Sequence, residues 1–282
     1  MSASRDDDFA GKVAWIAGAA RPPGMGRSVA VQMARRGADV ACVDVVVDEP
    51  ASDQAYEVSR EALEATAEAV RAEGRRALML PVDLTDPEAV DASVRTTVAE
   101  LGRIDVCCNL SGGTGPRLGT AKVVDLEPDN WHRTIDANLT AMYLGSRACA
   151  RQMIEQGSGG AIVSLASSAA VTGEPNFGAF SAARAGVVRL TEVLAAELGP
   201  FGIRANAVCP LGVSPEKGGG NPGLVFGAVR RGVKLDDWIT GKIPLGRMQS
   251  PDETAAVMVF LASDEASFVS GEHVIVAGGA HV

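Results

Sequence analysis

The sequence predicts one doubly wound α/β domain that spans residues 1–282 and is built on a seven-stranded, mostly parallel sheet. Two observations carry this prediction. Short apolar runs alternate along the chain with longer stretches of helical periodicity, which is the order of elements in an α/β fold. The apolar runs are also nearly continuous, as expected for parallel strands that helices cover on both faces. No linker divides the chain, so we expect a single domain.

Seven strands are expected where the apolar runs lie. They are Val13–Ala17, Val40–Asp44, Ala77–Val82, Ile104–Asn109, Ala161–Leu165, Ile203–Val208 and His273–Val276. The first helix is expected from about Gly24 to Arg36, and Pro87 marks the start of another. A second helix is indicated by the i, i+3, i+4, i+7 spacing of Leu63, Thr66, Ala67 and Val70. Two longer helices are expected near 128–155 and 176–199.

The composition excludes several classes of protein. The chain is 46% hydrophobic and 22% charged, with a formal net charge of -9, which is the balance of a folded globular protein. The acidic charge argues against a nucleic acid or an anionic membrane as partner. No apolar run approaches the roughly 20 residues of a membrane-spanning helix. The acidic segment Met1–Asp8 does not resemble a secretory signal, so we expect a cytoplasmic protein.

The cysteine and histidine residues give no sign of a metal site. The five cysteines are odd in number and form no Cys-x-x-Cys pair, so neither a disulfide framework nor a zinc site is expected. A reducing cytoplasm suits this pattern. The three histidines lie too far apart in the sequence to suggest metal ligands.

A glycine-rich segment joins the first predicted strand to the first helix. It reads Gly18-Ala19-Ala20-Arg21-Pro22-Pro23-Gly24-Met25-Gly26. Glycines at such a turn let the backbone approach a pyrophosphate, and the helix N-terminus supplies N–H groups and a positive dipole end. We therefore expect cofactor contacts from Gly18, Arg21, Gly24, Met25 and Gly26. The alternative is a helix-capping turn that binds nothing.

An acidic residue follows at the spacing that dinucleotide binding requires. Asp44 ends the second strand, 18 residues after Gly26. A carboxylate there suits the adenosine ribose 2′-OH of NAD and would repel the 2′-phosphate of NADP. Arg21 and Arg27 favour the phosphate instead. The sequence thus predicts NAD as cofactor and leaves NADP open.

Several further segments resemble one enzyme family along nearly the whole chain. Asp83-Leu84 is similar to an adenine-binding pair, and Asn109-Leu110-Ser111-Gly112 to Asn-Asn-Ala-Gly, of the short-chain dehydrogenase/reductase family. The stretch between Asp44 and Asp83 is longer than usual and resembles that of carveol-dehydrogenase-type members. The resemblance implies a Rossmann fold, an NAD(P)-dependent oxidoreductase, and cofactor contacts from Asp83, Leu84, Asn109 and Gly112.

The same resemblance implies the catalytic positions, with two replacements. Asn138 falls at the family's active-site Asn, and Ser167 lies 13 residues before position 180, as the family's Ser does before its Tyr. The family's Tyr-x-x-x-Lys is here Phe180-Ser181-Ala182-Ala183-Arg184. Phe has no proton to give, whereas Arg184 can still donate to ribose hydroxyls but is a poor proton shuttle. The expected catalytic set is Asn138, Ser167, Phe180 and Arg184.

A second alignment frame leads to the same replacement. Enoyl reductases of the superfamily have a longer phosphate turn and a Tyr seven residues before the Lys, in a Pro-Asn-Tyr context. This chain has Pro175-Asn176-Phe177 there, so the Tyr is again Phe. The two tyrosines of the sequence, Tyr56 and Tyr143, lie far from either frame.

The segment after the sixth strand completes the expected site. Pro210-Leu211-Gly212-Val213-Ser214-Pro215 is similar to the family's Pro-Gly-x-Val-x-Thr, which implies a cofactor contact from Val213. Pro215 offers neither hydroxyl nor N–H in place of the Thr. Residues at about 210–240 are expected to form a substrate lid, or else a plain surface excursion. The substrate-pocket residues are expected to be Glu174, Asn176, Phe177 and Leu211.

Three functions stay open at this point. The first is an NAD(P)-dependent oxidoreductase without the Tyr acid, acting on an apolar small molecule by reduction of an imine or enone. Glu174 is then either a substitute acid or a solvated loop carboxylate. The second is a non-redox isomerase, lyase or cyclase, and the third is an inactive binding subunit. The resemblance also implies a homotetramer in which the helices near 128–155 and 176–199 pair between subunits.

Overall fold

The computed structural model describes residues 7–21, 24–47, 58–115, 118–214, 225, 228–229 and 232–280. Within these residues, seven strands form one sheet in the order β3-β2-β1-β4-β5-β6-β7, and every neighbouring pair is parallel. The strands are β1 Val13–Ala17, β2 Asp39–Asp44, β3 Ala77–Pro81, β4 Val106–Asn109, β5 Gly160–Leu165, β6 Ile203–Pro210 and β7 His273–Val276. The predicted doubly wound α/β fold is confirmed, with a wholly parallel sheet.

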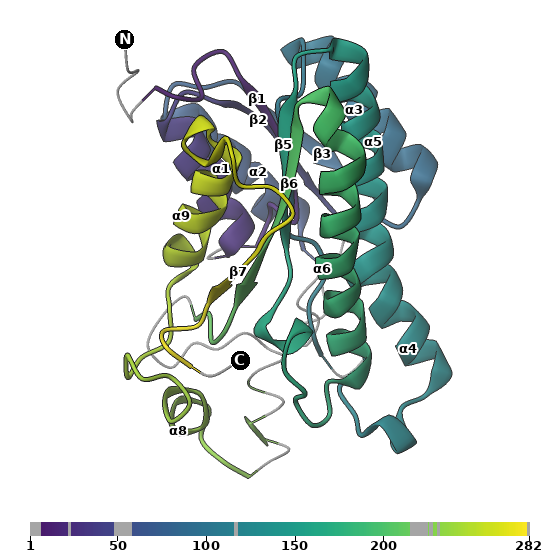
Figure 1. Cartoon of the computed structure of the whole chain (residues 1–282), viewed down its shortest axis with the longest axis vertical. Helices are drawn as coiled ribbons and strands as arrows, with labels where there is room; N and C mark the ends of the chain where they lie inside the picture. The colour runs from purple at the N-terminus through teal and green to yellow at the C-terminus, as the bar shows by residue number, and fades with distance from the viewer. Residues whose placement is uncertain are drawn as a thin grey trace.

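Helices cover both faces of the sheet (Figure 1). One layer consists of α1 Met25–Arg35, α2 Arg60–Ala72 and α9 Pro251–Ala262. The other consists of α3 Pro87–Leu101, α5 Ala141–Gln156 and α6 Gly178–Leu198. Two shorter helices, α4 Pro128–Ile135 and α8 Leu235–Thr240, lie near one end of the strands. No helix among the described residues has the length and apolar character to cross a membrane.

Local sequence sets the ends of the helices. The Ser59 hydroxyl caps the start of α2, and the Asp86 carboxylate caps α3 just before a proline. Ser250 and Glu253 cap α9 reciprocally, each side chain accepting a backbone N–H of the other. Gly102 ends α3 in the left-handed conformation. These caps explain where α2, α3 and α9 begin and where α3 ends.

The long helix expected near 128–155 is helical throughout, from Pro128 to Gln156. Residues Asp136–Thr140 form a wider π-helical turn inside it, between α4 and α5. Such turns insert an extra residue into the helix and occur often at functional sites. The helix expected at 176–199 runs from Gly178 to Leu198 as α6.

The apolar core has one layer on each face of the sheet. Successive strand residues point to opposite faces, so Ile16 packs in the layer beneath α1 and α9 while Trp15 packs beneath α3 and α5. The Trp15 indole N–H is satisfied inside that layer, because it donates to the Ser93 hydroxyl at 3.2 Å. All five cysteines are buried and free.

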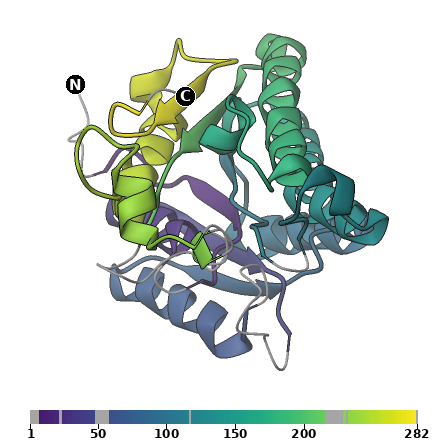
Figure 2. The same cartoon turned by 90° about the horizontal axis from the view of Figure 1, so that it is seen from below.

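The sheet topology determines where a ligand can bind. The chain leaves β1 toward one helical layer and leaves its neighbour β4 toward the other, so a crevice opens at the carboxyl ends of these strands. Viewed from below, α8 lies over this edge of the sheet (Figure 2). The predicted site residues should therefore converge there.

Candidate active site

A cavity of about 640 Å³ opens at the carboxyl edge of the sheet, a size that is ordinary for a small-molecule site. It extends from Asp44 at the end of β2 to Phe180 on α6 and Trp238 on α8. Most residues predicted from the sequence border it. They are Gly18, Arg21, Gly24, Met25, Gly26, Asp44, Gly112, Ser167, Glu174, Phe177, Phe180, Arg184, Leu211 and Val213.

The glycine-rich turn brings backbone against backbone. A Cβ on Gly26 would collide with the Gly18 carbonyl oxygen, and a Cβ on Gly18 would lie 2.6 Å from the backbone carbonyl carbon of Leu110. Gly18 also has φ +80, which side chains rarely adopt. Gly24 is the N-cap of α1 and offers no side chain to the first N–H groups of that helix. The turn therefore presents a bare helix N-terminus to the cavity, which fits a pyrophosphate.

The cationic side chain of this turn also borders the cavity. Arg21 lines it close to Gly24, whose Cα is packed against the Arg21 backbone. Burial lowers the pKa of the Arg21 guanidinium from its ordinary value. Arginine keeps its charge at neutral pH even so, and a cation here suits a phosphate.

Asp44 is held at the wall by two backbone donors. Its carboxylate accepts the N–H of Ala20 at 2.8 Å and the N–H of Val45 at 2.9 Å. Burial nevertheless dominates and raises the pKa of Asp44 to about 7. An ionised carboxylate here needs a further donor, and the hydroxyls of an adenosine ribose would supply one. The residues of this half of the cavity fit NAD.

Three predicted cofactor residues do not line the cavity. Asp83 is exposed, and its carboxylate accepts the N–H and hydroxyl of Thr85 at 2.9 and 2.7 Å. Leu84 belongs to the apolar core. The buried Asn109 amide donates to the Ser146 hydroxyl at 2.9 Å, so it ties β4 to α5 behind the cavity.

Asn138 also lies behind the cavity wall. Its amide donates to the carbonyls of Gly113 and Thr134 at 3.1 and 3.0 Å, and its oxygen accepts the Gly113 N–H at 2.9 Å. The side chain sits in the π-helical turn and is fully buried. It therefore fixes the Gly112–Thr114 segment, which does line the cavity.

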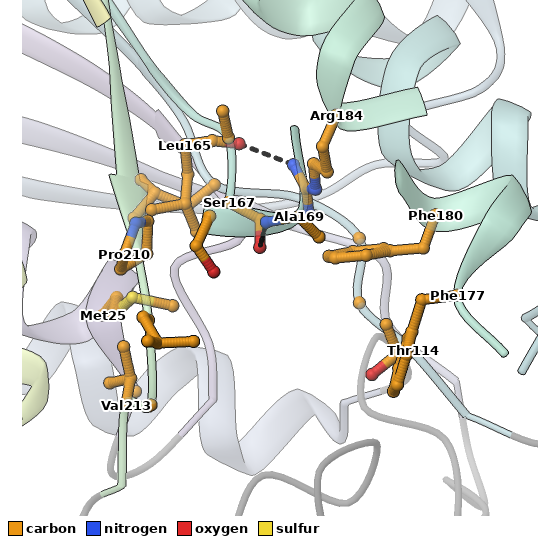
Figure 3. Close-up of a pocket in the computed structure, with 18 of the residues that line it drawn as sticks. Met25, Thr114, Leu165, Ser167, Ala169, Phe177, Phe180, Arg184, Pro210 and Val213 are labelled. Atoms are coloured by element: carbon orange, nitrogen blue, oxygen red, sulfur yellow. Dashed lines mark hydrogen bonds between the residues drawn. The ribbon is translucent and has the colours of Figure 1, made fainter. Parts of the chain in front are cut away.

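Ser167 follows β5 and faces the cavity. Its hydroxyl oxygen points into the space enclosed by the lining residues (Figure 3). The same oxygen accepts the N–H of Ala169 at 3.2 Å, which fixes the side chain at the start of a short helical turn. The hydroxyl proton can be donated to a substrate heteroatom.

Arg184 is buried inside the wall and donates to backbone oxygens. One terminal nitrogen donates to the Leu165 carbonyl at 2.6 Å and the other to the Ser111 carbonyl at 3.0 Å. The guanidinium carbon lies 5.2 Å from the centre of the Phe180 ring. Burial lowers the pKa of Arg184 to about 9, which leaves it charged at neutral pH. The side chain thus links the end of β5 to the segment after β4, and Figure 3 shows its bond to Leu165.

The two phenylalanines form one apolar wall. The rings of Phe177 and Phe180 meet edge to face, with centroids 6.4 Å apart. Asn176 precedes them with φ 71, a left-handed conformation that turns the chain into α6, and it does not border the cavity. Both alignment frames therefore place an aromatic ring without a hydroxyl at the same wall.

Glu174 borders the cavity and is held in an ion pair. Its carboxylate accepts a hydrogen bond from the Lys242 ammonium at 2.8 Å, so it forms an ion pair rather than acting as a solvated loop acid. Lys242 in turn lies 5.4 Å from the centre of the Trp238 ring. The pair connects the segment before α6 to the segment after α8 at the mouth of the cavity.

Several lining residues were not anticipated from the sequence. Thr114, Thr172, Trp238, Ile239 and Lys242 all border the cavity. Trp238 and Ile239 fall within the lid expected at about 210–240, while most of its first half, including Pro215, lies outside the described residues. The sequence feature that could have pointed to this part of the cavity is Trp238, the one tryptophan in the stretch 235–240. Of the two tyrosines, Tyr143 on α5 is away from the cavity, and Tyr56 lies outside the described residues.

The fold and the glycine turn define a dinucleotide-binding protein of the doubly wound type. Comparison with known proteins makes this specific. The family model described as Enoyl-(Acyl carrier protein) reductase matches residues 18–281. The chain belongs to the short-chain dehydrogenase/reductase family.

Two of the similar curated relatives are named as dehydrogenases of hydroxylated cyclohexanes. The chain is 36% identical over 279 residues to trans-4-hydroxycyclohexanecarboxylate dehydrogenase of Sinomonas cyclohexanicum, covering 97% of this chain and 94% of the relative. It is 37% identical over 273 residues to cyclohexanol dehydrogenase of Rhodococcus sp. (strain TK6), covering 95% of this chain and 96% of the relative.

Solved structures agree along nearly the whole length. Carveol dehydrogenase from Mycobacterium avium in complex with NAD superposes with a TM-score of 0.87 at 33% identity, covering 97% of this chain and 98% of that chain. A short chain dehydrogenase from Mycobacterium paratuberculosis bound to NAD gives a TM-score of 0.85 at 32% identity, covering 96% and 98%. Both of these structures hold NAD, and the prediction of NAD as the cofactor is confirmed.

Proposed function

We propose that this protein is an NAD-dependent oxidoreductase of non-standard active site, which reduces an apolar small molecule bearing an activated double bond, an imine or an enone. One observation carries the proposal. The glycine turn at one end of the cavity suits a dinucleotide, whereas the wall at the proposed reacting end presents Ser167, Phe180 and Arg184. When bound, NADH supplies the hydride to the electrophilic carbon of the substrate, and a proton from water completes the addition.

The titratable side chains of the cavity support reduction of an activated double bond rather than oxidation of an alcohol. The titratable side chains among the described lining residues are Arg21, Asp44, Glu174, Arg184 and Lys242. Asp44 lies at the other end of the cavity, and Glu174 is paired with Lys242. Oxidation of an alcohol requires a base at the hydroxyl, and a positioned acid or base contributes about 10²–10⁴ in rate. An enone or an iminium accepts hydride with less need of such a group.

The lining also indicates the shape of the substrate. Phe177, Phe180, Leu211, Trp238 and Ile239 give an apolar surface, with Ser167 and Thr114 as hydroxyl donors. The relatives named for cyclohexanol and 4-hydroxycyclohexanecarboxylate act on six-membered carbocycles, and carveol dehydrogenase is named for a terpenoid alcohol. We propose a cyclic, largely apolar substrate that enters beside Trp238, beneath a lid formed by residues at about 210–240.

Domain organisation, assembly and location extend the same proposal. We propose that residues 1–282 form one domain, because the described strands share a single sheet. A homotetramer is supported by apolar side chains that α5 and α6 leave exposed, Tyr143 and Val193 among them. A cytoplasmic location is supported by five cysteines that are all free.

A non-redox enzyme is the second candidate, and an inactive binding subunit is the third. The specific observation that favours the second is the paired wall of Phe177 and Phe180, whose two rings carry no group that can donate a proton. An isomerase, lyase or cyclase could use such a pocket for shape. The two candidates differ from the main proposal in requiring no NADH.

The decisive experiment is titration of the purified protein with NADH and NADPH, followed by binding heat and by cofactor emission. Micromolar binding of NADH would support the oxidoreductase, and activated cyclic alkenes and imines would then be tested before simple ketones. Absence of binding for both cofactors would overturn it in favour of the second or third candidate. Binding of NADH with turnover of ketones alone would overturn the preference for activated bonds.

A further inference from the structure

Among the residues that the structure describes, no carboxylate balances the charge of Arg184. The side chain is 2% exposed, and no Asp or Glu of the described chain forms an ion pair with it. Its terminal nitrogens donate to two backbone carbonyls, while its Nε is buried with no hydrogen-bond partner. Buried cations are normally paired, so an isolated one in a cavity wall requires an explanation.

The groups packed around the guanidinium are neutral. Phe180 presents an aromatic face that cannot ionise, and Met142 on α5 presents its sulfur at 3.3 Å. Cys209 on β6 is the titratable neighbour, and burial raises the pKa of its thiol to about 11, so it is uncharged at neutral pH. A tyrosine at position 180 could become an anion beside the arginine, but Phe180 cannot. The net charge here stays positive.

This charge lies at the half of the cavity that receives the second mononucleotide. In a doubly wound sheet the strand order reverses at one point, which here lies between β1 and β4. The adenosine half of a dinucleotide lies over β1 and the strands on the β2 side of that point, and the other half lies over β4 and the strands beyond it. Asp44 ends β2, whereas Arg184 bonds to Leu165 at the end of β5 and to Ser111 just after β4. The remaining charged pair, Glu174 with Lys242, is neutral overall. Arg184 therefore faces the nicotinamide end.

The two redox forms of the cofactor differ in charge at that end. The oxidised nicotinamide ring is a cation and the reduced ring is neutral, while the pyrophosphate and adenosine are the same in both. A fixed cation in a low-dielectric wall repels the first form and not the second. Because NADH and NAD⁺ share the pyrophosphate and adenosine, hydrogen bonds to these groups change both affinities equally. Their contribution cancels when the affinity for NADH is divided by the affinity for NAD⁺.

We propose that Arg184 is a specificity-determining residue that selects NADH over NAD⁺ in binding. The proposal rests on the proposed function, because it requires that NAD(H) occupies the cavity. Arg184 in place of the family's Lys and Phe180 in place of its Tyr then have one joint effect, which is an unbalanced positive charge beside the nicotinamide ring. The role is electrostatic and is distinct from the support that Arg184 gives to the ends of β4 and β5.

The test compares the dissociation constants of NADH, NAD⁺ and ADP-ribose for the wild type and three variants. Arg184→Met removes the charge, and Arg184→Lys keeps it while losing one of the two carbonyl contacts. Arg204→Met is the matched control, because Arg204 also donates to backbone carbonyls, those of Leu261 and Ser263, but does not border the cavity.

Wild type is expected to bind NADH at least about tenfold more tightly than NAD⁺. Arg184→Met should lower that ratio about tenfold and leave the ADP-ribose constant within about threefold of wild type. Arg184→Lys and Arg204→Met should keep the wild-type ratio. A ratio unchanged in Arg184→Met, or lowered equally in Arg184→Lys, would overturn the charge-selection role.

Two outcomes separate this inference from the function on which it rests. If wild type binds none of the three nucleotides, the proposed function itself fails. If all three bind but wild type shows no preference for NADH, only the role of Arg184 fails. The wild-type ratio also decides the matter should Arg184→Met not fold, which thermal unfolding of the variant would reveal.

Discussion

The two halves of the cavity are built in different ways. Around Gly18, Gly26 and Asp44 the geometry is made by backbone, with main chain packed on main chain and two N–H groups fixing one carboxylate. Around Phe180 and Arg184 it is made by side chains that project from α6. A backbone cradle tolerates almost no added atom, whereas a side chain can change its chemistry while keeping its volume. Under the proposed function, the phosphate half keeps the family's form and the reacting half departs from it.

The largest expected effect tests the reacting half. Phe180→Tyr combined with Arg184→Lys restores the family's acid and its partner, so reduction of a simple cyclic ketone by NADH should rise by about 10²–10⁴. Initial rates with wild type and the double variant measure this. Phe177→Tyr with Arg184→Lys is the matched control for the enoyl-reductase frame. Comparable ketone reduction by wild type would contradict the view that the missing hydroxyl limits this chemistry.

The next effect tests the phosphate half. Gly26→Ala places a Cβ against the Gly18 carbonyl oxygen, so the turn must shift and NADH affinity should fall by about two orders of magnitude. The same overpacking should lower the free energy of unfolding by about 1–3 kcal/mol. Titration and chemical denaturation measure the two quantities. Gly199→Ala, where an added Cβ meets no atom within 4 Å, should change neither.

A pH dependence of stability should come from Asp44. Burial raises the pKa of Asp44 in the folded protein from 3.8 to about 7, so the folded state holds its proton more tightly than the unfolded chain. The resulting stability is complete below about pH 4 and is lost as the pH rises through about 7. Relative to Asp44→Asn, wild type should lose about 2–3 kcal/mol between about pH 5 and pH 8. A difference that stays constant with pH would show that the carboxyl is already ionised at the lower pH.

Asp44 should also determine the preference of the phosphate half for NADH over NADPH. Asp44→Ala removes the carboxylate that disfavours a 2′-phosphate, so the preference for NADH over NADPH should fall about tenfold. Dissociation constants for both cofactors measure the preference. Unchanged constants would remove the role assigned to Asp44, and Asp83→Ala provides a comparison at an exposed acid outside the cavity.

The smallest effect concerns the mouth of the cavity. The Glu174–Lys242 pair is partly exposed, with 25% and 42% of the two side chains accessible, so it should contribute well under about 1 kcal/mol to stability. Lys242→Met should shift KM for the substrate by a few fold and leave NADH binding unchanged. Lys12→Met, which breaks an ion pair with Asp264 away from the cavity, is the control. A large loss of NADH affinity in Lys242→Met would show that the pair belongs to the cofactor half.

The sequence was sufficient for the fold because strands, turns and caps are local signals. The apolar runs located all seven strands, and the spacing from Gly26 to Asp44 placed both residues on one cavity. It was less informative where a contact depends on distant packing. Asn138 and Asn109 match the family's pattern, yet their amides are used inside the structure, which no linear spacing reveals. The Glu174–Lys242 pair joins residues 68 positions apart and could not be read from either segment.

Trp238 gives the cavity an optical consequence. Of the three tryptophans in the chain, Trp15 is sealed in the core and Trp131 lies partly exposed on α4, while Trp238 alone of them borders the cavity. Indole emission overlaps the absorption of a dihydronicotinamide, so excitation of Trp238 should pass by resonance energy transfer to a bound reduced ring. The protein thus carries its own fluorescent reporter of bound reduced cofactor, and titrations with NADH and NADPH can be followed without a label.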